Sequence, residues 1–137
     1  MVNPIALIVE DEKDLARIFA RALRGGGFEV EIVYAGDEAI EWLCGNTPAL
    51  VVLDLQLPGA SGPDVFAYIR AQPHLSEIVT IIVTAYPHIA DDLTNEADCV
   101  LFKPVNHAEL RALAERFRPA ASADEGADAK GRGSQNE

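Results

Sequence analysis

The chain has 137 residues, and its 22 acidic and 11 basic side chains give a formal net charge of −11. This length is typical of a single domain, and a hydrophobic fraction of 49% is enough for a sizeable core. The acidic balance argues against nucleic acid or an anionic membrane surface as a partner, because both carry negative charge.

Five short apolar segments have the composition of strands in a parallel sheet. Four of them are apolar almost throughout, and the second alternates between apolar and polar residues. Continuous apolar runs are typical of strands that helices cover on both faces. The five segments are residues 5–9, 30–33, 50–53, 78–83 and 99–102.

Helical spacing follows each of the first two strands. Gly25 is expected to end the first helix. The apolar stripe of this helix consists of Leu15, Ile18, Phe19, Ala22 and Leu23. Asp37 and Glu38 suit the positive end of a second helix, since acids are favoured there. The stripe of that helix consists of Ala39, Ile40 and Leu43, and Trp42 is a further candidate for it.

Two later helices have recognisable beginnings. Ser61 and Gly62 open one of them, and Pro63 stands in its first turn. Asn106 and Glu109 are expected to form the N-cap and its capping partner for the last helix. The residues expected to face the core are Val65, Phe66, Ile69, Leu110, Leu113, Ala114 and Phe117.

The alternation of strands and helices predicts an α/β fold with right-handed crossovers. We expect a flavodoxin-like three-layer sandwich, in which five parallel strands in the order 2-1-3-4-5 carry five helices. The fourth helix is expected to be short or irregular, because only Ile89 and Leu93 form an apolar pair there. Residues 1–118 would form the domain. Residues 119–137 contain no large apolar side chain and are expected to be a disordered tail.

Polar residues follow four of the predicted strands. Glu10 and Asp11 come after the first strand, Asp54 after the third, Thr84 after the fourth and Lys103 after the fifth. Ligands of open parallel sheets bind beyond the carboxyl ends of the strands, where the strand order reverses. We therefore expect the three carboxylates to converge on one pocket, with the hydroxyl and the ammonium beside it.

Such a pocket would suit a metal ion and phosphoryl transfer. Carboxylates that share a pocket repel one another, and Mg²⁺ relieves this because it prefers oxygen ligands. An ammonium and a hydroxyl would stabilise phosphoryl oxygens while one carboxylate attacks in line. Each residue also has a plainer interpretation, as a helix cap, a turn acid, a strand residue or a surface lysine. The joint placement favours the site.

Four segments carry a resemblance to a known family. They are IVEDE at 8–12, LDLQLPGASG at 53–62, VTAY at 83–86 and ADCVLFKP at 97–104. In order and spacing along residues 5–118, the sequence resembles the receiver domain of bacterial two-component response regulators.

The resemblance implies a phosphorylation site that depends on Mg²⁺. Asp54 would accept a phosphoryl group from a phosphohistidine of a sensor histidine kinase or a histidine phosphotransfer protein. Asp11 and Asp54 would ligate Mg²⁺, and Glu10 would hold it through water. The backbone carbonyl of Gln56 would be a further ligand.

The resemblance also assigns roles at the far strands, where two departures occur. Thr84 would bond a phosphoryl oxygen, Lys103 would pair with the phosphoryl group, and the Lys103–Pro104 bond would be cis. Val100 stands where receivers often carry an aromatic residue that rotates inward. The interval from Thr84 to Lys103 is shorter than usual by roughly one helical turn.

The function expected from these residues is that of a phosphorylated receiver that signals through an unknown output protein rather than DNA. It would not be an enzyme with an external substrate. One alternative is a constitutive protein-interaction module in which phosphorylation is uncoupled from output. A metal-dependent phosphatase is a further alternative, but Gln56 stands where such enzymes place a general acid.

A cytoplasmic location is expected, without a membrane partner. No apolar run approaches the ~18 residues of a membrane span. The N-terminus has no signal-peptide pattern. Cys44 and Cys99 are too few for a disulfide framework, so a reducing compartment is expected.

Overall fold

The computed structural model describes residues 3–86 and 96–119. Five parallel strands form one sheet in the order β2-β1-β3-β4-β5, which confirms the predicted fold class and strand order. Every predicted strand lies within one residue of an observed one. The strands are β1 (Ile5–Val9), β2 (Glu29–Val33), β3 (Leu50–Asp54), β4 (Val79–Thr84) and β5 (Cys99–Phe102).

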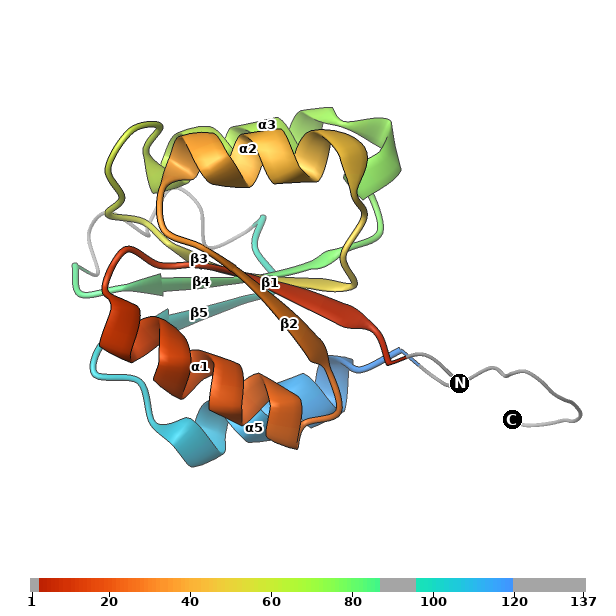
Figure 1. Cartoon of the computed structure of the whole chain (residues 1–137). Coiled ribbons are helices and arrows are strands. Elements are labelled where there is room, and N and C mark those ends of the chain that lie inside the picture. Colours follow the sequence, from red (N-terminus) through yellow and green to blue (C-terminus); the bar gives the residue numbers. More distant parts are fainter. Residues whose placement is uncertain (1–2, 87–95, 120–137) are drawn as a thin grey trace, which may run out of the picture.

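Helices cover both faces of the sheet (Figure 1). On one face lie α1 (Lys13–Gly25) and α5 (His107–Phe117), and on the other α2 (Gly36–Gly45) and α3 (Gly62–Ala71). A short 3₁₀ turn, Pro73–Leu75, follows α3. None of the helices in the described part of the chain has the length and apolarity needed to cross a membrane. The predicted fourth helix and tail lie almost wholly outside the described residues.

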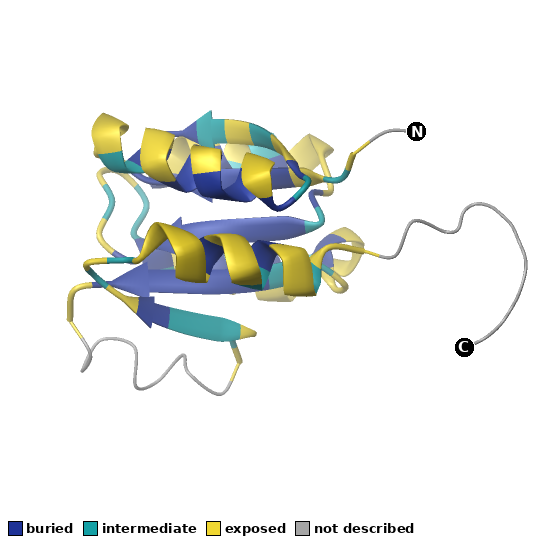
Figure 2. Cartoon of the chain, turned by 90° about the horizontal axis from the view of Figure 1, so that it is seen from below, coloured by how far each residue is buried: buried dark blue, intermediate teal, exposed yellow. Residues whose placement is uncertain are grey.

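The core consists of two apolar layers that share the central strands. Ala6 and Ile8 of β1 point into the layer under α1 and α5, whereas Leu7 and Val9 point into the layer under α2 and α3. All five residues of β3 are buried, as Figure 2 shows for the centre of the sheet. Burying a Leu or Ile side chain contributes about 1.5–3 kcal/mol, so this double burial explains the continuous apolar runs.

The predicted helix starts of α3 and α5 are confirmed. Ser61 Oγ accepts the Asp64 N–H at 3.2 Å, and the Asp64 carboxylate accepts the Ser61 N–H at 3.4 Å. Asn106 Oδ1 accepts the Glu109 N–H at 3.1 Å. These bonds satisfy backbone donors that a helix start leaves without intrahelical partners.

The predicted stripe of α1 is wrong at one position. The Ile18 residue is 42% exposed, whereas Ala16 and Ala20 are fully or almost fully buried. The buried face consists of Ala16, Phe19, Ala20, Ala22 and Leu23. Small side chains allow α1 to approach the sheet and α5, and alanines give a weaker hydrophobic signal than the isoleucine beside them.

Candidate functional site

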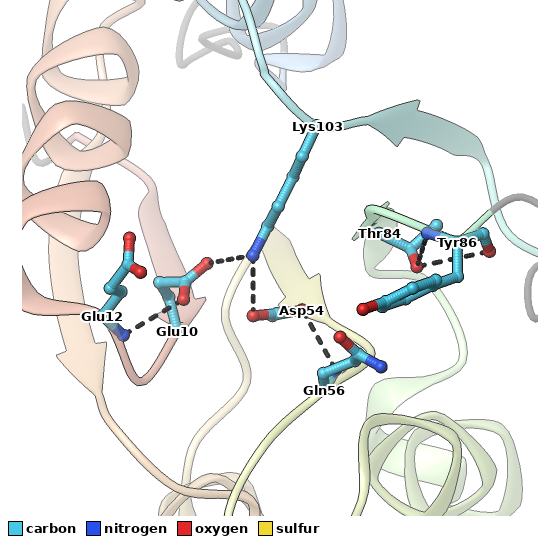
Figure 3. Close-up of polar contacts among 7 residues, drawn as sticks. All are labelled: Glu10, Glu12, Asp54, Gln56, Thr84, Tyr86 and Lys103. Carbon is cyan, nitrogen blue, oxygen red and sulfur yellow. Dashed lines mark hydrogen bonds and ion pairs between the residues drawn. The ribbon is translucent and has the colours of Figure 1, made fainter.

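The carboxyl ends of the strands bring the predicted site residues to one edge of the sheet (Figure 3). Asp54 is the last residue of β3 and pairs in register with Val83, and Thr84 is the last residue of β4 and pairs with Phe102. Glu10 directly follows β1, and Lys103 directly follows β5. Because the strands are parallel and in register, side chains that are far apart in the sequence meet here.

Three carboxylates form the centre of this edge. Oxygen atoms of Glu10, Asp11 and Asp54 all lie within 4.8 Å of one another. Glu10 is 1% exposed and Asp54 is 3% exposed, whereas Asp11 is exposed to solvent. Negative groups at this separation repel one another, and burial of two of them adds a desolvation cost.

Lys103 supplies positive charge to this cluster. Its Nζ donates a hydrogen bond to Asp54 Oδ2 at 3.1 Å and lies 3.4 Å from Glu10 Oε1. Burial lowers the pKa of Lys103, but the hydrogen bond and charge of Asp54 and the charge of Glu10 outweigh it and raise the pKa overall. The ammonium therefore stays charged between the two buried carboxylates.

Among the described residues, only one of the two carboxylate oxygens of Glu10 accepts a hydrogen bond. Its Oε2 accepts the Glu12 N–H at 3.1 Å. Its Oε1 is buried and has no hydrogen-bond partner among the described residues. Burial, followed by the charge of Asp54, raises the pKa of Glu10 to about 7, although the Glu12 N–H and Lys103 act in the opposite direction.

The donor set fits a magnesium ion. Carboxylate and carbonyl oxygens are the ligands that Mg²⁺ prefers. One ammonium contacts two of the three carboxylates here, and the buried Glu10 Oε1 has no hydrogen-bond partner among the described residues. Gln56 N–H donates to Asp54 Oδ1 at 3.0 Å, so the Gln56 peptide lies directly beside this carboxylate.

Thr84 is buried at the same edge, but its hydroxyl contacts its own loop. Thr84 Oγ1 accepts the Tyr86 N–H at 3.0 Å and approaches the Tyr86 carbonyl oxygen at 3.5 Å. No hydrogen bond joins it to the carboxylates in the described part of the chain (Figure 3). The predicted contact with a phosphoryl oxygen stays a prediction.

The β5 residues around Lys103 take up different environments. Val100 is partly buried and packs against the core layer under α2 and α3. Phe102 is 50% exposed. The Lys103–Pro104 peptide bond is cis, as the resemblance implied.

Sequence reasoning missed two interactions of this edge. The contact between Lys103 and Glu10 joins residues from opposite ends of the chain. The sequence predicts for Asp37 only a place at a helix start, yet its carboxylate also binds the loop that follows Asp54. A spacing argument cannot detect either pair, because both depend on tertiary packing.

The geometry described above agrees with comparisons to known proteins. A family model of the response regulator receiver domain matches residues 6–115. The chain belongs to this family. Receiver domains are signalling modules of two-component systems.

Several relatives and solved structures are similar to this receiver. The DNA-binding response regulator MtrA of Mycobacterium tuberculosis is 33% identical over 77% of this chain and 46% of its own length. A CheY-like receiver domain from Methylobacillus flagellatus has a TM-score of 0.76 and 26% identity, over 85% of this chain and 99% of that one.

A third similar protein was solved with a metal ion. The receiver domain of the sensor histidine kinase PA1611 from Pseudomonas aeruginosa PAO1 has a TM-score of 0.75 and 25% identity, over 85% of this chain and 98% of that one. It holds a magnesium ion coordinated in its active site cleft. Receiver domains bind Mg²⁺ in an acidic pocket, and this chain has a cluster of three carboxylates that could hold such an ion.

The prediction that nucleic acid is excluded as a partner is wrong. MtrA is named a DNA-binding response regulator, and the chain spans about half the length of the curated relatives it matches. The negative charge describes this receiver alone. It therefore does not exclude nucleic acid from the output of a protein that contains such a receiver.

Proposed function

We propose that this receiver takes a phosphoryl group from a phosphohistidine onto Asp54. Asp11, Asp54 and the carbonyl of Gln56 would bind Mg²⁺, and Glu10 would hold it through water. The observation that carries the proposal is the buried Glu10–Asp54 pair, which shares one ammonium and leaves Glu10 Oε1 without a hydrogen-bond partner among the described residues.

The arrangement around Asp54 suits a nucleophilic carboxylate. Lys103 holds Oδ2 and the Gln56 N–H holds Oδ1, so both oxygens have fixed positions. In the transfer, a bond forms between a carboxylate oxygen of Asp54 and phosphorus. The phosphorus–nitrogen bond of the donor breaks, and its electron pair stays on the imidazole. A bound Mg²⁺ would offset the negative charge of the phosphoryl oxygens.

The other residues act on the phosphoryl group after transfer. Lys103 is close enough to Asp54 to pair with a phosphoryl oxygen attached there. The Thr84 hydroxyl would exchange its bond with Tyr86 for one to the phosphoryl group. This exchange would alter the Thr84–Tyr86 turn and so change the surface around it.

We propose that the output of this signal involves nucleic acid, as the name of MtrA states for that relative. A unit other than this acidic receiver would make the contact, because phosphate contacts need basic side chains. A kinase donor and a DNA-directed output both belong to the cytoplasm, where we place the protein.

The proposal is tested by incubating the protein with phosphoramidate and Mg²⁺ and measuring the intact mass. We expect one phosphoryl group per chain with Mg²⁺ and none after addition of a chelator. An unmodified protein in the presence of Mg²⁺ would contradict the proposal.

The second candidate function is a constitutive protein-interaction module, in which phosphorylation is uncoupled from output. The position of Val100 favours it. A valine that packs into the core cannot rotate as an aromatic switch residue does. Phosphorylation would then change amide signals at the pocket but leave those of β5 and α5 unchanged. Changes that reach α5 would favour the phosphorylation-controlled receiver instead.

A further inference from the structure

The β3–α3 loop, residues 55–61, is bound to the start of α2. The Gly36 N–H donates to the Pro58 carbonyl at 3.2 Å. The Asp37 carboxylate, through Oδ1, accepts the Ala60 N–H at 2.8 Å. The second bond is short and has a charged acceptor, and such bonds are stronger than neutral ones.

The backbone is shaped to bring these groups together. A Cβ at Gly36 would lie 1.8 Å from the Ala60 carbonyl oxygen, so only glycine allows this approach. Gly59 has a φ of +73°, and a Cβ there would lie 2.8 Å from Asp37 Oδ2. Both glycines therefore permit the loop to pack directly against the Asp37 carboxylate.

The other end of the loop is bound to the sheet and to α3. Leu55 N–H donates to the Val83 carbonyl at 3.1 Å, and Gly62 N–H donates to the Leu55 carbonyl at 3.3 Å. Gln56 and Leu57 are the residues between this attachment and the one at Pro58. The position of the Gln56 peptide beside Asp54 thus depends on attachments on both sides.

We propose that Asp37 is a positioning residue of the phosphorylation site. By holding Ala60, its carboxylate fixes the β3–α3 loop and with it the Gln56 peptide, whose N–H binds Asp54. The proposal rests on the proposed function, which makes Asp54 the phosphorylation site and the Gln56 carbonyl a ligand of Mg²⁺. The competing interpretation is that Asp37 merely complements the positive end of α2.

Two substitutions separate these interpretations. Asp37→Ala removes the acceptor, whereas Asp37→Asn removes the charge but keeps an oxygen that can accept the Ala60 N–H. Glu41→Ala is the matched control, because Glu41 is an exposed carboxylate on the same helix. Amide hydrogen exchange of Ala60 and Gln56 is measured first, and Mg²⁺ alone is then titrated while amide shifts are followed.

In Asp37→Ala, we expect the Ala60 and Gln56 amides to exchange roughly tenfold faster than in the wild type. We also expect Mg²⁺ affinity to fall about tenfold, as for other residues that orient metal ligands. Asp37→Asn should recover most of both values, and Glu41→Ala should equal the wild type. Thermal unfolding of each variant shows whether global stability accounts for the change.

Equal exchange and equal Mg²⁺ affinity in Asp37→Ala and the wild type would overturn the proposal. So would an Asp37→Asn variant as impaired as Asp37→Ala, because charge at the helix start would then be the cause. A wild type that is not phosphorylated would contradict the proposed function. The exchange rates of Ala60 and Gln56 would still decide whether Asp37 fixes the β3–α3 loop.

Discussion

The site has a β1–β3 end and a β4–β5 end, and the two differ in the polar contacts that hold their side chains in place. At the β1–β3 end, Glu10 accepts the Glu12 N–H, Asp54 accepts the Gln56 N–H, and Asp37 accepts the Ala60 N–H of the β3–α3 loop. At the β4–β5 end, Thr84 contacts Tyr86 rather than the carboxylates, and Phe102 is exposed. Lys103 lies between the two ends and contacts both buried carboxylates. The proposed phosphoryl transfer would thus use groups that already contact one another, whereas a response at Thr84 would require new contacts.

The largest expected effect lies at the β1–β3 end. Asp54→Asn should abolish phosphorylation, because an amide oxygen is a much weaker nucleophile than a carboxylate. The intact mass after incubation with phosphoramidate and Mg²⁺ measures this. Asp14→Asn, at an exposed position of α1, is the control and should be modified like the wild type. Full modification of Asp54→Asn would show that another residue accepts the phosphoryl group.

The next effect concerns Mg²⁺ alone. Asp11→Asn should weaken Mg²⁺ binding by at least tenfold, since even residues that only orient metal ligands commonly contribute ~10–100-fold. Calorimetric titration measures the affinity. The fold should be unaffected, because Asp11 is exposed. An unchanged affinity would mean that the ion binds away from this cluster.

A smaller effect is expected where the two ends meet. Lys103→Ala should lower the free energy of unfolding by about 1–3 kcal/mol, because Glu10 and Asp54 then stay buried without their cation. Urea unfolding measures this in the presence and absence of Mg²⁺. Added Mg²⁺ should recover more stability in the variant than in the wild type. Equal recovery in both would show that the ammonium and the ion do not compensate the same charges.

The smallest effect on the unphosphorylated protein is expected at the β4–β5 end. Thr84→Ala should leave Mg²⁺ affinity within about twofold of the wild type, because Thr84 Oγ1 bonds Tyr86 rather than the carboxylates. With beryllofluoride and Mg²⁺, the Tyr86 amide signal should shift in the wild type and not in the variant. A shift of the Tyr86 amide signal of equal size in both proteins would show that Thr84 takes no part in the response.

The strand ends could be predicted from the sequence because a parallel sheet places all its carboxyl ends at one edge. From this rule alone, Glu10, Asp54 and Lys103 are predicted to be neighbours, although the sequence contains no distances. It gave no information on which side chains would pair, so the bond from Ala60 to Asp37 was not foreseen. The exposure of Ile18 was missed because the packing of α1 selects alanines over a larger residue.

The error about nucleic acid has a different origin. Net charge determines what one surface attracts, and it was applied to the partners of a whole protein. MtrA shows that a relative of this receiver is DNA-binding although the match covers 46% of it. Charge arguments therefore hold for the domain whose residues are counted.

Locating the phosphoryl group tests the central claim most directly. The phosphorylated protein is reduced with borohydride, digested and sequenced by mass spectrometry. The account predicts that the single modified residue is Asp54, within the peptide that joins β3 to α3. A phosphoryl group on another residue, or none with Mg²⁺ present, would contradict it.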